Sequence, residues 1–106
     1  MAKFLFEANY TPEGAKGVIK DGGSGRRAAI EKAVTGLGGR LEAFYFAFGK
    51  VDAYVIVDLP DNATAAAMAF AVSQSGLAST RTVVLLTMEE TDAATKKAVT
   101  YRAPGK

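Results

Sequence analysis

Two strand-like runs at the centre of the chain, residues 40–49 and 52–60, constrain the fold more than any other feature. Both runs, RLEAFYFAFG and DAYVIVDLP, are rich in the aromatic and β-branched residues that favour strands. Only a tight turn at Gly49–Val51 separates them. Such a short connection joins antiparallel neighbours, so the two runs predict a β-hairpin.

Further strands and helices are predicted on both sides of the hairpin. Residues 3–10 and 79–90 have the composition of strands. Residues 61–76 read as a helix that begins at the cap-forming Asp61 and is apolar on more than one side. This pattern predicts a helix with neighbours on several sides.

A second helical region lies between residue 11 and Gly38. Thr11 is suited to cap its start, and the glycine pair Gly22 and Gly23 predicts the end of a short first helix. A stronger helix is predicted from Ser24, because the following residues repeat apolar side chains at helical spacing.

The resulting order, βαββαβ, predicts an α+β fold of the ferredoxin-like type, a four-stranded antiparallel sheet with helices across one face. Side-chain alternation places large apolar groups on both sheet faces. In the second strand we expect one side to carry Leu41, Ala43, Tyr45 and Ala47, and the other Glu42, Phe44, Phe46 and Phe48. Because two helices cover only one face, we expect the other face to contact a second copy of the chain, in a homodimer or larger oligomer.

Composition excludes much familiar chemistry. The 106 residues include no cysteine and no histidine, so the chain offers no disulfide, no thiolate or imidazole metal ligand and no histidine base. We therefore expect no metal and no cofactor. The net charge of +2 is too small to indicate a nucleic-acid partner. No long apolar run or signal peptide is visible, so we expect a cytoplasmic protein without membrane contact.

The chain resembles the GYD-domain family up to about Glu90, through YTPEGAKGVIKDGGSGRRAAIEKAVTGLGGRL, FGKVDAYVIVDLPDNATAAAMAFAVSQSG and RTVVLLTMEE. The most specific pieces are Thr11-x-x-Gly14, Ile19-Lys20 and the Gly-Gly before the second strand, to which Gly49-x-x-Asp52 and Pro60-Asp61 are added. The resemblance implies a small bacterial protein of the dimeric α/β-barrel type, and it assigns no catalytic residue. One departure is Val51, where the family usually has tyrosine.

Three cations near the glycine pair form a possible anion site: Lys20, Arg26 and Arg27. Arginines at the start of a helix lie close to its positive dipole end. This placement is unfavourable, and a bound anion would compensate it. However, GGSGRR matches neither the phosphate-loop nor the dinucleotide-binding pattern. We favour the alternative that this stretch is a joint between two helices with solvated arginines.

Asp52, Tyr54 and Tyr45 are the candidate catalytic residues. Asp52 and Tyr54 fall on the same side of their strand. If that side faces the helices, the pair would line a ligand-binding cleft between sheet and helices, with Asp52 as a base and Tyr54 or Tyr45 holding a substrate oxygen. The alternative, which we favour, is that Asp52 completes the hairpin turn and the tyrosines are structural.

Other charged residues have structural readings. Glu7 is expected to pair with Arg81 on an adjacent strand, and Glu89 and Glu90 to form the solvated end of the fourth strand. We expect residues 1–90 to form one domain and residues 91–106 to add a short helix and a mobile basic tail.

The function that these features favour is a homo-oligomeric protein that binds a small molecule or a partner. The alternative is a cofactor-independent oxygenase or isomerase acting on an aromatic or carbonyl compound. A third reading is a regulatory module that uses the alanine-rich helix at 61–76 to bind a partner.

Overall fold

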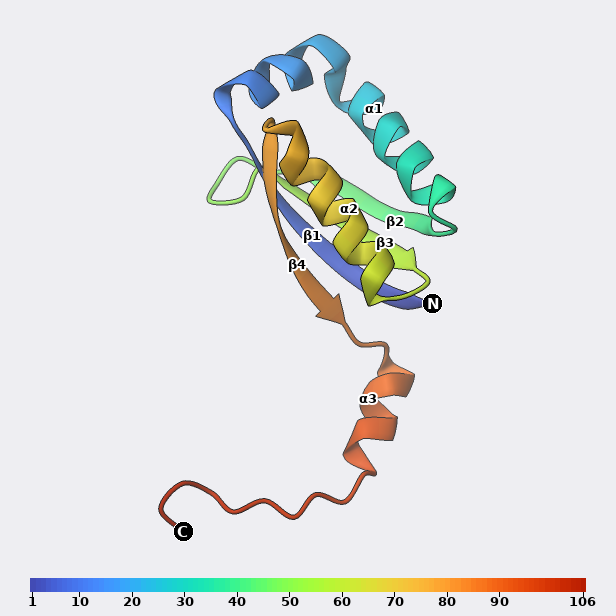
Figure 1. Ribbon diagram of the computed structural model, residues 1–106, viewed down its shortest axis with the longest axis vertical. Helices are drawn as coiled ribbons and strands as arrows, with labels where there is room; N and C mark the ends of the chain where they lie inside the picture. Colours follow the sequence, from blue (N-terminus) through green and yellow to red (C-terminus); the bar gives the residue numbers. More distant parts are fainter.

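The computed structural model describes residues 1–106 (Figure 1). Its elements are β1 (Ala2–Tyr10), α1 (Pro12–Gly36), β2 (Arg40–Phe46), β3 (Ala53–Leu59), α2 (Asn62–Ser75), β4 (Ala78–Leu85) and α3 (Met88–Thr95). The four strands form one antiparallel sheet in the order β2-β3-β1-β4. The predicted α+β, ferredoxin-like βαββαβ fold is therefore confirmed, and α3 follows it.

Both long helices lie on the same face of the sheet (Figure 1). We call this the covered face and the opposite one the open face. Helix α1 packs chiefly on β2, and α2 packs chiefly on β4. Strand β3 shows the alternation most clearly, because Val55, Val57 and Leu59 are buried under the helices while Tyr54 and Ile56 point the other way.

Helix α1 is two helices joined at Gly22. That residue has φ 75° and ψ 165°, a conformation open almost only to glycine, and the helix resumes after it. Thr11 caps the first part, as predicted, by accepting a hydrogen bond from the backbone N–H of Gly14 at 3.1 Å. The glycine-rich stretch GGSGRR is thus a joint between helices, with its break where the sequence predicts it.

A β-bulge in β2 corrects the predicted sides of that strand. Leu41 lies opposite Val57, but Ala43 lies opposite Ile56, so Glu42 is an extra residue. The prediction that Leu41 and Ala43 share a side is wrong, because the extra residue shifts every later side chain to the other face. Phe44 and Phe46 consequently join Leu41 on the covered face, whereas Ala43 and Tyr45 lie on the open face.

The connection between β2 and β3 is longer than the predicted tight turn. Strand β2 ends at Phe46 and β3 begins at Ala53, and the backbone N–H of Ala47 donates to the Asp52 carbonyl at 2.8 Å. The loop includes Phe48, whose side chain is fully exposed. The hairpin itself is confirmed.

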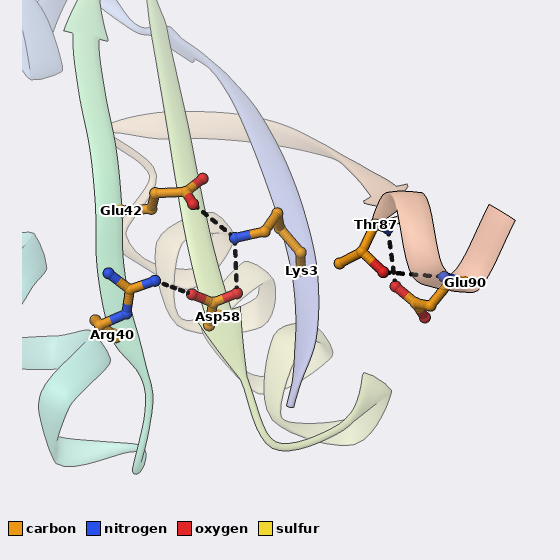
Figure 2. Close-up of polar contacts among 6 residues, drawn as sticks. All are labelled: Lys3, Arg40, Glu42, Asp58, Thr87 and Glu90. Carbon is orange, nitrogen blue, oxygen red and sulfur yellow. Dashed lines mark hydrogen bonds and ion pairs between the residues drawn. The ribbon is translucent and has the colours of Figure 1, made fainter. Parts of the chain in front are cut away.

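The fourth strand stops at Leu85, short of the predicted Glu90. Thr87 and Glu90 form a reciprocal capping box that starts α3 (Figure 2), and Glu89 also lies in its first turn. The expectation that Glu89 and Glu90 end a strand is wrong, because this cap and the favourable charge at a helix N-terminus begin a helix here. Helix α3 buries no residue and projects away from the sheet with the C-terminal tail (Figure 1).

Candidate functional site: an apolar cavity under the helices

A cavity lies between the covered face of the sheet and the two long helices. It contains about 550 Å³ of unfilled space, including its open mouth, and 12 of its 14 lining residues are hydrophobic. Strand β1 contributes Phe6 and Ala8, α1 contributes Ile30, and α2 contributes Met68 and Ala69. The part of this space that admits water-sized molecules is about 60 Å³, smaller than typical small-molecule sites of about 300–1,000 Å³, so a ligand would have to be small or the helices would have to move apart around it.

The cavity is lined by small side chains on both the helix side and the sheet side. These are Ala69 of α2, Ala8 of β1 and Ala78 of β4. Each alanine has only a methyl group to fill the space between helix and sheet. Since α1 and α2 rest on different strands, neither helix closes the gap that these alanines leave.

Aromatic side chains gather at one end of the cavity. The rings of Tyr10 and Phe46 stack with centroids 6.5 Å apart, and those of Phe44 and Phe46 lie 4.9 Å apart. Tyr10 and Phe44 line the cavity directly. The bulge at Glu42 makes this cluster possible, because it turns Phe44 and Phe46 toward the covered face.

The polar groups of the cavity are few. Besides the Tyr10 hydroxyl, only Arg26 and Thr80 bring polar side chains to its lining. Burial raises the pKa of Tyr10 above its ordinary value of 10.0, although the Arg26 guanidinium acts in the opposite direction. Tyr10 therefore stays a neutral hydroxyl at physiological pH, able to donate or accept a hydrogen bond.

The three cations of the predicted anion site do not converge. Arg26 lines the cavity, whereas Arg27 lines a separate groove with Phe44 and Phe46, and Lys20 is exposed on the first part of α1. Arg26 forms an ion pair with Asp21 across the Gly22 joint at 3.6 Å. Of the three, Arg26 alone lies where a molecule in the cavity could reach it.

The three candidate catalytic residues lie away from the cavity lining. The carboxylate of Asp52 accepts a hydrogen bond from the backbone N–H of Tyr10 at 2.8 Å, and its own N–H donates to the Ala8 carbonyl at 3.0 Å. Tyr54 lies on the open face directly opposite Tyr45. The structure thus ties Asp52 to β1 at the end of the hairpin and pairs the tyrosines on the other side of the sheet.

The open face carries an apolar row flanked by charges. Across the four strands this row consists of Ala43, Ile56, Leu5 and Val83. On one side of it, Glu7 and Arg81 form the predicted pair at 3.6 Å. The face therefore combines apolar surface with ion pairs rather than isolated charges.

On the other side of the row, Lys3 and Asp58 centre a network of four charges (Figure 2). Lys3 contacts Glu42 at 2.8 Å and Asp58 at 2.9 Å, and Arg40 contacts Asp58 at 2.8 Å. The hydrogen bonds to Glu42 and Asp58 raise the pKa of Lys3, and the hydrogen bond from Lys3 lowers the pKa of Asp58. Two positive and two negative groups thus balance each other.

Sequence analysis expected a cleft between sheet and helices, but it placed Asp52 and Tyr54 there and missed Tyr10, which lines the cavity. Alternation groups Tyr10 with the core residues of β1, but it does not show that the space beside it is unfilled. The available signal was the small size of Ala8, Ala69 and Ala78, which line the cavity. The structure also contains no cluster of three or more acidic residues placed to hold a metal ion, and none of its helices combines the length and apolarity of a membrane span.

Fold and cavity together define an α+β protein with a ferredoxin-like sheet and an apolar site beneath its helices. The chain belongs to the GYD domain family, which matches residues 4–95. Comparison with curated proteins gives no match, and comparison with solved structures gives none either.

Proposed function

We propose that this protein is a homo-oligomer that binds a small, largely apolar molecule in the cavity under its helices. The observation that carries the proposal is the cavity itself, where side chains leave space beside Phe6, Met68 and Ala69. Protein interiors are normally packed without such gaps, and unfilled apolar space lowers stability. A ligand of matching size would restore those contacts.

The oligomer in this proposal forms through the open face. Leu5, Ile56 and Val83 form an apolar strip that no element of the same chain covers. The flanking charges are balanced within the protomer, so a second copy can approach without net repulsion. A two-fold dimer would place the strip against its own equivalent.

The alternative, a cofactor-independent oxygenase or isomerase acting on an aromatic or carbonyl compound, has less support. Tyr45 and Tyr54 are on the open face, and Asp52 is used in two hydrogen bonds to β1. An enzyme that used these residues would need a substrate site other than the cavity.

Titration with indole, a neutral apolar probe, tests the ligand site. Two-dimensional amide NMR of the labelled protein should show shifts at cavity-lining residues, and Ala69→Leu should weaken binding by filling the space. Ala67→Leu is the matched control, because Ala67 is exposed on the same helix and lines no part of the cavity. Shifts elsewhere, or equal binding by both variants, would contradict the proposed site.

Native mass spectrometry tests the oligomer. We expect a multimer for the wild type and a folded monomer for Ile56→Lys, which puts a charge in the apolar strip. Phe48→Lys, in the exposed loop, should leave the multimer intact. A wild-type monomer at micromolar concentration would refute this part of the proposal.

A further inference from the structure

We propose that the ligand of the cavity is a small monocarboxylic acid with an apolar body, whose carboxylate pairs with Arg26. This inference rests on the proposed ligand site and adds the chemical class of the ligand. The charge of the lining points to it, because Arg26 is the single charged residue among the 14 that line the cavity. No carboxylate lines the cavity, and Asp21, which pairs with Arg26, lies outside that lining.

The existing partner of Arg26 leaves the guanidinium available. Asp21 lies 3.6 Å away, and the side chains of Arg26 and Asp21 are 30% and 45% exposed. This separation exceeds ordinary hydrogen-bond length, and an exposed ion pair of this kind contributes little to stability. A guanidinium has five N–H donors and binds a carboxylate through two parallel hydrogen bonds.

The neighbouring groups favour one negative charge rather than two. Tyr10 and Thr80 bring hydroxyl groups, which can donate hydrogen bonds to a carboxylate oxygen but carry no charge to balance a second anion. A phosphate dianion would leave one charge uncompensated in an apolar space, which is unfavourable. An amine would be repelled by Arg26.

The rest of the lining selects the body of the acid. Phe6, Phe44 and Met68 surround the space with aromatic rings and a thioether, groups that pack well against an aromatic ring. An acid such as phenylacetate combines one ring with one carboxylate. Its amide, phenylacetamide, has nearly the same shape and no charge.

The experiment compares phenylacetate with phenylacetamide by amide NMR titration of the full chain. We expect the wild type to bind the acid about ten-fold or more tightly than the amide, the ratio that a charge-assisted hydrogen bond provides. Arg26→Met should remove this difference, because it should weaken the binding of the acid and leave the affinity for the amide unchanged. Arg27→Met, the matched control in a different groove, should behave as the wild type.

Each outcome bears on the inference. Equal wild-type affinity for the two compounds would overturn it, and this comparison needs no variant to fold. An acid preference that survives in Arg26→Met would also overturn it, because another cation would then be responsible. If indole binds and the acid and amide bind equally, the proposed ligand site is supported and the carboxylate inference is refuted. If none of the three compounds binds, both proposals are refuted.

Discussion

The two faces of the sheet are built from alternate residues of the same strands, yet they are stabilised in different ways. On the covered face, Val55, Val57 and Leu59 are each at most 7% exposed and pack in the core. On the open face, Asp58 and Lys3 are held in a balanced network of charges. One face is stabilised by excluding water, and the other by pairing its charges where water remains.

The comparison shows where ligand space and partner surface can arise. The covered face lies under helices that leave unfilled apolar volume, which the small molecule of our proposal would fill. The open face has no roof, so its weakness is exposed apolar surface, and only a larger surface remedies that. A one-residue slip of a strand would exchange the two sets of side chains.

The largest predicted effect contrasts neighbours on opposite faces. Phe4 is 1% exposed in the core, so Phe4→Ala should lower the free energy of unfolding by about 3–5 kcal/mol. Leu5→Ala should lower it by about 1 kcal/mol or less in the dilute monomer, because Leu5 lies on the uncovered strip. Urea unfolding measures both, and equal losses would show that the faces do not differ as described.

The joint at Gly22 of α1 provides the next prediction. Gly22→Ala should lower the free energy of unfolding by about 1–3 kcal/mol, because alanine is strained at φ 75° and ψ 165°. Gly36→Ala, in the last turn of α1 with open space around it, is the control and should leave the free energy of unfolding unchanged or raise it by up to about 1 kcal/mol. A Gly22→Ala protein as stable as the wild type in thermal unfolding would mean that the joint straightens at no cost.

The charge network on the open face predicts a smaller, pH-dependent effect. Asp58→Asn should cost about 1–2 kcal/mol at neutral pH, since the Asp58 side chain is only 16% exposed and contacts two cations. The folded-state pKa of Asp58 lies below its ordinary value of 3.8, so this stabilisation is complete above that value and is lost as the pH falls through the folded pKa.

Urea unfolding of wild type and Asp58→Asn from neutral pH to about pH 2 checks the sign of this effect. The two curves should converge only in acid. Asp92→Asn, an exposed position in α3, should follow the wild type throughout. A difference between wild type and Asp58→Asn that grows on acidification would contradict the assigned direction.

The smallest predicted effect lies beyond both faces. Thr87→Ala removes the capping box of α3 and should increase amide exchange in that helix. Because α3 buries no residue, the free energy of unfolding measured in urea should stay within about 0.5 kcal/mol of the wild-type value. A larger loss would show that α3 supports the sheet.

The sequence predicts the fold correctly where the preferences of single residues set a boundary. Thr11, Gly22 and Asp61 end or begin helices through their own backbone and side-chain preferences, and the structure places those boundaries there. The bulge at Glu42 was not accessible, because RLEAFYF alternates plausibly in either phase and only pairing with β3 reveals the extra residue. The start of α3 was accessible in principle from the Thr87-x-x-Glu90 pattern.

The candidate site was harder to predict, because it consists of space that the side chains leave unfilled. The sequence shows Arg26 and Tyr10 but not that they line one space, since that follows from the divergence of α1 and α2 over different strands. Asp52 illustrates the opposite case. Its interpretation as a turn residue followed from its position alone, and its hydrogen bond to the Tyr10 backbone agrees with it.

The projecting C-terminal segment affects how the size of this protein is judged in solution. The radius of gyration is 16.8 Å, whereas a compact chain of this length has about 13 Å. A value of 16.8 Å corresponds to a compact protein of about 210 residues. On a column calibrated with globular standards, a lone protomer of this shape would elute close to the position of a dimer, so mass rather than elution volume must decide the assembly.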